Sequence, residues 1–556
     1  MTKYVKRLTA GLMALALVAC SNGGGSAATP TPASTSGTET QAPAAEPGYK
    51  TTFTFAIGGE PTYLDPSRTG DSVTAEVTNQ IWDTLFILGE DGSPVPSNCI
   101  DWSVSDDGLT YTFKLDPNGK WSDGEPLTAE HYVFGIKRCI GMGYDNVGFL
   151  EFITKYVKNA EAHVLDDVAN MDDVGVRAVD DFTLEIELFT LCPFFTSLTP
   201  AIVYAAQRPE FSTEHDSEWS STPGYPTTGA FYPTKIDAAS EFILKKNENF
   251  AHADDVTVDE MIIKVMPSME ASQMAFRTGE IDYDTSAGSD VVNIPDLKDN
   301  IIIAGNVNYY MSINCYEGNP ALNDVRVRRA MQLGMDRSAF VTALDAGDVF
   351  YELNGFIPHG LPGINGDFRT ESDNTEKLVY TDKDEARALM EEAGFSETNR
   401  LALEYSYNQN SMHDTVAAVI TEQLKDIYID VTLKTSELRT FFDDRSYGRY
   451  DICRNAYSAD YMDPYNFMAL MDTSNNTRGI FFGDDYYNQQ LAETFNMTGD
   501  ERLQAFHDLE HYAIAEQCWN CPLFGYGDVS LQKTGTTGVI VNPQGTHYFM
   551  YVKCPE

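Results

Sequence analysis

The sequence predicts an α/β protein that folds as more than one lobe. Beyond an N-terminal stretch rich in small residues, about 500 of the 556 residues remain, and a chain of that length exceeds what one hydrophobic core organises. Hydrophobic residues make up 42% and aromatic residues 12% of the sequence, which is enough to fill ordinary globular cores. Segments that alternate like strands are mixed with capped segments that have helical spacing. We therefore expect two or three lobes that each combine strands with helices.

The first part of the folded chain is predicted to contain a strand, a helix and a hairpin. Residues 51–57 alternate polar and apolar side chains, which predicts a strand. Apolar residues recur at helical spacing over 73–86, which predicts a helix. Asp106-Asp107-Gly108 separates two alternating segments, 102–104 and 109–115. An Asp-Gly turn between such segments predicts a β-hairpin.

The middle of the chain continues this mixture. Thr128 is a candidate N-cap for a helix that runs to about Cys139. Residues 182–188 and 241–245 have the alternation and composition of strands. We therefore expect one helix and two further strands in this region.

Helix signals dominate the C-terminal half. Asn323-Asp324 precedes a segment whose apolar residues fall on one helical face, so this pair is expected to cap that helix. Thr381 with Asp384 three residues later resembles a capping box, and Gly394 marks the end of the helix that it starts. Two further segments complete the pattern: a helix at 416–427 and a strand at 429–433.

The N-terminus has the pattern of an exported bacterial lipoprotein. Three basic residues within 1–7 precede an uncharged apolar run at 8–19. This run is too short to span a bilayer and has the length of a signal-peptide core. It ends in Leu17-Val18-Ala19-Cys20, which resembles a lipobox. We expect Cys20 to become lipid-modified and to start the mature chain; an ordinary signal peptide with an incidental Cys is the alternative.

A linker is predicted between this anchor and the folded part. Residues 21–48 are almost all Gly, Ser, Thr, Ala and Pro, a composition that cannot bury enough apolar surface to order itself. No later segment has the roughly 20 apolar residues that a membrane-spanning helix needs. The lipid on Cys20 is therefore the only membrane attachment that the sequence predicts.

Charge and cysteine content narrow the function further. The formal net charge of −45 argues against nucleic acid as a partner and is typical of a soluble surface, with at most a weak steering of cationic ligands. Besides Cys20 the chain has eight scattered cysteines, so no disulfide scaffold is predicted. Cys518 and Cys521 have redox-like spacing but lack a second pair. They are expected to be a structural pair, either buried as thiols or linked.

Several stretches, taken in chain order, resemble one known family. They are 60–66 (EPTYLDP), 102–113 (WSVSDDGLTYTF), 120–129 (KWSDGEPLTA), 228–231 (TGAF), 246–250 (KNENF), 277–282 (RTGEID), 323–330 (NDVRVRRA) and 457–464 (YSADYMDP). Together they are similar to the peptide-binding proteins of ABC importers, the family 5 solute-binding proteins. The resemblance covers residue 50 to the C-terminus. Most of these stretches are turns and capped helices, which identify the fold rather than a site.

The resemblance implies a two-lobed periplasmic-binding-protein-like fold of type II, with an extra domain and two hinge strands. The lobes are expected to close over the ligand. The implied organisation is a signal peptide at 1–20, a linker at 21–48, lobe I at 49–82, 200–305 and 527–556, an extra domain II at 83–199, and lobe III at 306–526.

The resemblance also implies the residues that meet the two charged ends of a peptide. A buried charge needs a partner, because leaving it unpaired costs several kcal/mol. Asp460 stands where oligopeptide-binding members carry the carboxylate for the ligand's α-ammonium; an Asp in a turn is the alternative. Arg454 matches an Arg that takes the carboxylate of shorter peptides, with a structural ion pair as the alternative. His413 matches a His that meets the C-terminus of a longer ligand, with an exposed helix-cap His as the alternative.

Weaker contacts complete the implied site. The segment before Asp460 is expected to lie along the ligand backbone as a neighbouring strand. Oligopeptide-binding members often carry Trp where this chain has Tyr457 and Leu438, so the side-chain preference is left open. The implied contacts are Ala456, Tyr457 and Ser458 beside the ligand backbone, Gly70, Asp71 and Ser72 across the cleft, and Tyr144 near the ammonium.

Two rival interpretations stay open from the sequence. The family also contains binders of nickel chelates, haem and oligosaccharides, although the set of Asp460, Arg454 and His413 favours peptide. The main rival class is an enzyme, because His507 to His511 fits the H-x-x-E-H pattern of some zinc peptidases. That pattern fixes only three of five residues. We therefore predict no metal, no cofactor and no catalytic residue.

The sequence thus predicts a lipid-anchored, monomeric binding protein that captures short peptides in an interlobe cleft. Its expected partners are the peptide and the permease subunits of an ABC importer. Its expected place is the extracellular face of a bacterial cell membrane or the periplasm, with Cys20 as the membrane attachment. A surface receptor without transport would use the same cleft and stays an alternative.

Overall fold

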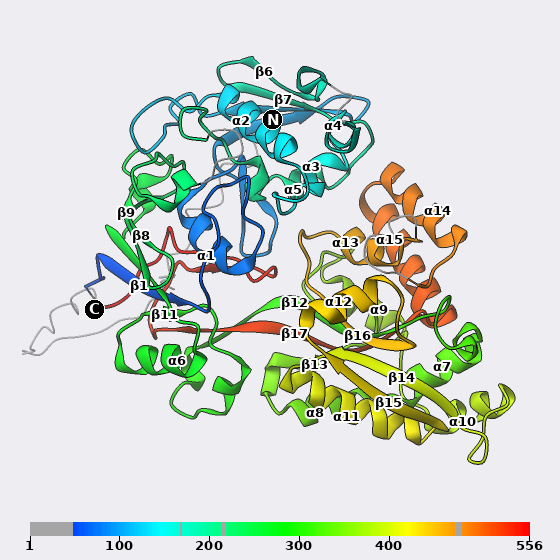
Figure 1. Ribbon diagram of the computed structural model, residues 1–556. Helices are drawn as coiled ribbons and strands as arrows, with labels where there is room; N and C mark the ends of the chain where they lie inside the picture. The colour runs from blue at the N-terminus through cyan, green and yellow to red at the C-terminus, as the bar shows by residue number, and fades with distance from the viewer. Residues whose placement is uncertain (1–47, 167–169, 213–217, 474–480) are drawn as a thin grey trace, which may run out of the picture. The chain divides into compact units, whose positions relative to one another are not determined.

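A computed structural model describes residues 48–166, 170–212, 218–473 and 481–556 (Figure 1). One 11-stranded sheet runs through this part of the chain and joins strands that are far apart in the sequence. From one edge to the other its strands are β15 (Ile429–Ser436), β14 (Leu401–Asn408), β16 (Ile452–Tyr457), β12 (Ile301–Ile313), β17 (Asn520–Gln532), β11 (Tyr283–Asp284), β1 (Thr52–Ile57), β10 (Glu260–Val265), β9 (Glu241–Lys246) and β8 (Phe231–Asp237), and β13 (Phe350–Glu352) pairs with β17 outside this order.

Two long antiparallel strands, β12 and β17, occupy the centre of this order (Figure 1). Each has 13 residues, and their register shifts between Ala304 and Val307. Gly305 in that shift has a φ of +118°, and a Cβ added to it would lie 3.3 Å from Gly527 of the neighbouring strand. The positive φ and the tight contact therefore favour glycine at this register shift.

The described chain has two large hydrophobic cores, and β12 and β17 contribute side chains to the second. The first collects buried side chains from Phe53 to Tyr283, together with Tyr461 and the C-terminal stretch from Tyr548 to Cys554. The second collects side chains from Ala287 to Leu531. The fold therefore has two lobes that are joined by β12 and β17, as the sequence predicts. Residues of the predicted extra domain share the first core with those of the predicted lobe I, and the exact domain limits stay a prediction.

The predicted Asp-Gly hairpin is confirmed within a smaller sheet. Gly108 adopts a φ of +74° in the turn, a conformation that glycine takes without strain. This sheet has the order β4 (Cys99–Val104), β5 (Thr110–Leu115), β7 (Thr183–Glu187) and β6 (Val176–Asp180); two separate hairpins are β2 (Phe86–Leu88) with β3 (Pro94–Pro96) and β18 (Ile540–Val541) with β19 (His547–Tyr548).

The helices of the first lobe largely follow the sequence prediction. Thr128 is the N-cap of α2, and His131 completes a capping box with it. The predicted helix at 73–86 is shorter than expected, because Trp82 is extended and donates its indole N–H to the carbonyl of Leu64 at 2.9 Å. The helices are α1 (Ser72–Ile81), α2 (Ala129–Met142), α3 (Glu151–Thr154), α4 (Ala160–Asp166), α5 (Phe195–Leu198) and α6 (Met269–Thr278).

The second lobe contains most of the remaining helices. Asp324 caps α7 as predicted. The predicted capping box at Thr381 is wrong: Asp382 is the N-cap, and the hydroxyl of Thr381 donates instead to the carbonyl of Met335. The helices are α7 (Val325–Gly334), α8 (Arg337–Leu344), α9 (Phe368–Thr375), α10 (Lys383–Glu392), α11 (Ser411–Lys425), α12 (Leu438–Ser446), α13 (Tyr465–Met468), α14 (Asp485–Glu493) and α15 (Gly499–Glu510).

The cysteines and the membrane prediction have simple outcomes. All eight cysteines in the described part of the chain are buried free thiols, so Cys518 and Cys521 are a buried pair without a bond. Among the described helices, none has the length and apolar character needed to cross a membrane. Cys20 and the predicted linker lie outside the described residues, so the anchor stays a prediction.

Candidate functional site

The loop before α1 and the segment after β16 line one hollow of about 410 Å³, which we call the central hollow. It joins five predicted contacts from opposite ends of the sequence. Asp71 also accepts a hydrogen bond from the backbone N–H of Thr74 at 2.8 Å as the N-cap of α1, which fixes the loop. The five contacts are Gly70, Asp71, Ser72, Ser458 and Asp460.

Asp460 stands at the border of two hollows. Its Oδ2 accepts a hydrogen bond from the hydroxyl of Tyr457 at 2.5 Å, and its backbone N–H donates to Oδ1 of Asn466 at 2.9 Å. The second hollow, of about 460 Å³, has aromatic walls that include Tyr461 and Tyr465; we call it the aromatic hollow. The half-buried carboxylate of Asp460 is thus held in place and faces space on two sides.

The strand that leads to Asp460 has a free edge. β16 pairs with β12 along its whole length, from Ile452 to Tyr457. On its other side β14 pairs only with Ile452 and Cys453. Among the described residues, Arg454–Ala456 therefore have no strand pairing on that side. Such an edge is where an extended peptide can add as a further strand.

Two asparagines of β12 hold the end of this edge in place. Oδ1 of Asn308 accepts a hydrogen bond from the backbone N–H of Tyr457 at 3.1 Å. Oδ1 of Asn306 accepts one from the backbone N–H of Ala459 at 3.0 Å. Both asparagines are fully buried. They fix the path of the chain from β16 to Asp460.

Arg454 lies at the other end of the free edge. Its guanidinium donates to Oδ1 of Asn408 and lies 4.8 Å from the ring centre of Phe441. Only 8% of the residue is exposed, and its Nε has no hydrogen-bond partner among the described residues. Burial lowers the pKa of this guanidinium from its ordinary value. The alternative of a structural ion pair is not supported, because no described carboxylate pairs with Arg454.

A second arginine shares this position and was missed by the sequence analysis. Arg445 lies on α12 and lines the same hollow as Arg454. This hollow has a volume of about 200 Å³, and we call it the arginine hollow. Its guanidinium donates to Oδ1 of Asn455 at 2.9 Å, and no carboxylate is among the described residues of the lining. The two arginines meet because α12 packs against β14 and β15, and β14 is the neighbour of β16 in the sheet. A spacing of nine residues does not reveal this.

His413 is buried rather than exposed, which rules out the alternative of a solvent-exposed helix cap. It lies in the first turn of α11, whose N-cap is Asn410. One ring nitrogen, Nδ1, is 3.1 Å from the hydroxyl of Tyr309. Burial and the nearby charge of Arg454 lower the pKa of His413 to about 4. The neighbouring Met412, rather than His413, lines a hollow.

His413 should make stability depend on pH. Because its pKa is lower in the folded chain than its ordinary value of 6.5, the unfolded chain takes up this proton first as the pH falls. We expect His413 to cost about 2–3 kcal/mol of unfolding free energy between pH 7 and pH 4.5. Urea titrations of the native protein and of His413→Gln at several pH values measure this difference. Equal pH slopes for the two proteins would contradict it.

Tyr144 is placed apart from the other predicted contacts. Its hydroxyl lies 2.7 Å from that of Thr154, and the residue lines none of the hollows described here. Phe149 lines the central hollow instead, in a left-handed backbone conformation with a φ of 58°. A role for Tyr144 at the ammonium stays a prediction that the geometry does not favour.

Two acidic residues at the cleft were also missed. Glu76 on α1 and Asp528 on β17 both line the central hollow. Both also line a hollow of about 360 Å³ that includes Val349 and Met412 of the second lobe; we call it the lateral hollow. A surface helix and a hinge strand contribute one acid each, so no sequence motif joins them.

Comparison with known proteins identifies the family. Residues 93–479 match the family described as bacterial extracellular solute-binding proteins, family 5 Middle. The chain belongs to this family. Its members bind solutes and are not enzymes, so this solute-binding protein is not an enzyme.

Full-length relatives agree with this assignment. The periplasmic oligopeptide-binding protein OppA of Escherichia coli (strain K12) is 26% identical over 499 residues, which cover 88% of this chain and 90% of the relative. The oligopeptide-binding protein OppA of Bacillus subtilis (strain 168) is 27% identical over 522 residues, which cover 90% and 92%.

A solved structure supports the fold class. The murein tripeptide-binding protein MppA in its unliganded open form matches with a TM-score of 0.78 at 23% identity, covering 92% of this chain and 98% of that one. The predicted two-lobed fold of the type II periplasmic binding proteins is therefore confirmed.

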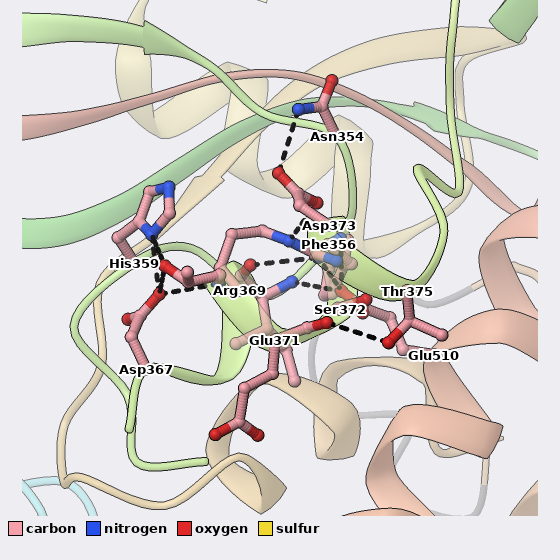
Figure 2. Close-up of polar contacts among 12 residues, drawn as sticks. Asn354, Phe356, His359, Asp367, Arg369, Glu371, Ser372, Asp373, Thr375 and Glu510 are labelled. Carbon is pink, nitrogen blue, oxygen red and sulfur yellow. Dashed lines mark hydrogen bonds and ion pairs between the residues drawn. The ribbon is translucent and has the colours of Figure 1, made fainter. Parts of the chain in front are cut away.

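Glu510, the acid of the H-x-x-E-H pattern, has a structural role in this solute-binding protein (Figure 2). Glu510 is fully buried and accepts a hydrogen bond from Nη1 of Arg369 at 2.8 Å. The ring of His507 stacks on that of Phe368, with 3.9 Å between the ring centres. Nδ1 of His511 lies 3.3 Å from Oε1 of Glu516. Within the described residues no group of three or more His, Cys, Asp or Glu is arranged to hold a metal ion.

Proposed function

We propose that this solute-binding protein captures short peptides with a free N-terminus in the cleft between its lobes. The open edge of β16 carries the proposal: Arg454–Ala456 have no strand pairing with β14 in the described part of the chain, and they lead toward Asp460. A backbone edge binds the backbone of any extended peptide, whatever its side chains. A carboxylate at the end of that edge supplies the partner that a buried ammonium requires. Relatives that are named oligopeptide-binding proteins support the same ligand class.

The two ends of the peptide would meet opposite charges. The ammonium would lie in the central hollow against Asp460, with Ser458 and the loop of Gly70, Asp71 and Ser72 around it. The peptide backbone would run along Ala456 and Tyr457. Its carboxylate would lie toward Arg454, whose guanidinium has no carboxylate partner in the described part of the chain. His413 is neutral at pH 7 and would serve a longer ligand only as a hydrogen-bond partner.

We infer delivery to a transporter from the same fold. The two strands β12 and β17 would form the hinge about which the lobes close, and a closed, loaded protein is what a permease of an ABC importer would recognise. We infer that the protein acts as a monomer on the outer side of the membrane. The lipid on Cys20 and the linker at 21–48 would keep it there.

Native mass spectrometry of the protein extracted with detergent from its own cells tests these proposals together. We expect the chain to start at a diacylglyceryl-modified Cys20 and to carry masses that fragment as short peptides. A bound sugar, chelated metal, porphyrin or bile salt in place of peptides would contradict the peptide proposal. An unmodified N-terminus would contradict the anchor alone.

A further inference from the structure

The aromatic hollow is walled by rings from distant parts of the chain. Its volume of about 460 Å³ lies within the range of pockets that bind small molecules, about 300–1,000 Å³. Some of the rings belong to α3 and the residues just after it, and the others belong to β16, to the segment that follows it, and to the residues after α14. The ring residues of the lining are Phe152, Tyr156, Tyr457, Tyr461, Tyr465 and Phe495.

Contacts between rings fix one part of this wall. The ring of Tyr461 stacks on that of Phe194, with 4.9 Å between the ring centres and 6° between the ring planes. Phe152 meets Tyr461 edge to face, with 5.7 Å between the ring centres. Phe152, Phe194 and Tyr461 are all buried. The wall therefore has ring faces and edges of fixed orientation, as in pockets that are formed before the ligand binds.

Another part of the wall is less covered. Phe495 packs edge to face against Tyr465, with 4.8 Å between the ring centres, and both residues are only half-buried. Both line the hollow, so part of their apolar surface faces the open space. A further ring that entered the hollow would remove this surface from water and would add ring contacts of its own.

Asp460 connects the aromatic hollow with the central hollow. Asp460 and Phe152 line both hollows, and the hydroxyl of Tyr457, which lines the aromatic hollow, donates to Oδ2 of Asp460 at 2.5 Å. In the proposed complex the ammonium of the peptide lies against Asp460. The side chain of the first residue is attached to the same carbon atom as this ammonium. It therefore starts at the boundary between the two hollows.

Charge does not select the occupant of the aromatic hollow. Besides Asp460, the charged residues of its described lining are Glu151, Lys155 and Asp472, so both signs of charge are present. A cationic side chain would meet Lys155 as well as the two acids. The rings are what distinguishes this hollow, and an aromatic side chain gains more from ring contacts than an aliphatic one of similar size.

We propose that the aromatic hollow receives the side chain of the peptide's first residue, so that the protein selects peptides that begin with phenylalanine, tyrosine or tryptophan. This inference rests on the proposed peptide function and names the substrate class within it. Side chains of a peptide that adds as a strand alternate between its two faces. The second side chain therefore points away from the face that the first one uses. The aromatic preference should be confined to the first position.

Matched tripeptides test the proposal by calorimetry. We expect the native protein to bind Phe-Ala-Ala at least about tenfold more tightly than tri-alanine, which is about 1.4 kcal/mol. Ala-Phe-Ala should gain less than about threefold over tri-alanine, because its ring lies at the second position. A peptide that begins with cyclohexylalanine has a side chain of similar size without an aromatic ring, and it should bind at least about twofold more weakly than Phe-Ala-Ala.

Two variants and one control show whether the gain comes from this hollow. Ala492 is exposed on α14 and lines the hollow, so Ala492→Trp fills the space. The ratio of the affinities for Phe-Ala-Ala and tri-alanine should then fall below about threefold. Phe495→Leu removes one ring and keeps an apolar side chain, and it should lower the ratio at least about twofold. The control, Ala418→Trp, changes an exposed alanine of α11 that lines none of the hollows and should keep the native ratio.

The outcomes separate this inference from the peptide function. The subsite is wrong and the peptide function stands if tri-alanine, the cyclohexylalanine peptide or Lys-Ala-Ala binds as tightly as Phe-Ala-Ala, or if Ala-Phe-Ala does. The same holds if Ala492→Trp and Phe495→Leu both keep the native ratio. If no tripeptide binds, both proposals are wrong. A preference for phenylalanine at the first position that either variant loses and the control keeps supports the subsite.

Discussion

Replacing Asp460 with asparagine is expected to weaken the binding of tri-alanine by roughly 100- to 1,000-fold. In the proposed complex the ammonium is buried in the central hollow against this carboxylate. The variant keeps the size of the side chain but leaves the ammonium without a charged partner, and breaking one side of a buried pair costs about 3–5 kcal/mol. Isothermal titration calorimetry measures the two dissociation constants directly.

The affinity for N-acetylated tri-alanine shows whether the contact that Asp460→Asn loses is the contact with the peptide's ammonium. The native protein should bind the free peptide far more tightly than the acetylated one, since acetylation removes the charge. In Asp460→Asn the difference between the two peptides should nearly vanish. The matched control is Asp106→Asn, which changes an exposed Asp in the turn between β4 and β5 and should leave both affinities as they are. An unchanged affinity for tri-alanine in the Asp460 variant would remove Asp460 from the site.

The fold was predictable where local signals and global packing agree. The hairpin around Gly108, the Thr128 cap and the Asp324 cap each depend on a few adjacent residues, and each is confirmed. The prediction failed where a distant contact decided the local structure. Trp82 leaves the helical path because its indole meets the carbonyl of Leu64, and Thr381 is drawn to the carbonyl of Met335. The spacing of residues in the sequence does not predict either contact, because Leu64 and Met335 are distant in the sequence from the residues that they bind.

The site was predictable only in part, for a related reason. Asp460 and Arg454 are six residues apart on one strand and its extension, so one resemblance placed both. Their opposite wall comes from α1 and the hinge strand, which meet only in the folded chain. Glu76 and Asp528 are therefore invisible to motif reasoning, as is Arg445, which reaches Arg454 through the packing of α12. The formal net charge of −45 predicted a negatively charged surface, but it did not predict which residues of the cleft are acidic.

Replacing Glu510 with glutamine is expected to lower the free energy of unfolding of the second lobe by about 3–5 kcal/mol. Glu510 is fully buried and accepts hydrogen bonds from the backbone N–H groups of Phe356 at 2.6 Å and Ile357 at 2.8 Å, besides the one from Arg369 (Figure 2). Glutamine keeps one acceptor oxygen but takes the negative charge away from a fully buried guanidinium. Asp373 alone, at 2.9 Å from Nε, would remain to balance it.

Hydrogen exchange of peptides from α9 and α15 measures this loss within the lobe, where the network lies. Glu516→Gln is the control, because Glu516 is an exposed carboxylate 3.3 Å from His511 just beyond α15, and such surface pairs contribute about 0–1 kcal/mol. Arg369→Met with Glu510→Leu should recover part of the loss, since no buried charge is then left unpaired. Recovery should stay incomplete because the two backbone N–H groups lose their acceptor. If hydrogen exchange is as slow in Glu510→Gln as in the control variant, the prediction is wrong. The buried pair would then not be what holds α15 against the loop that precedes α9.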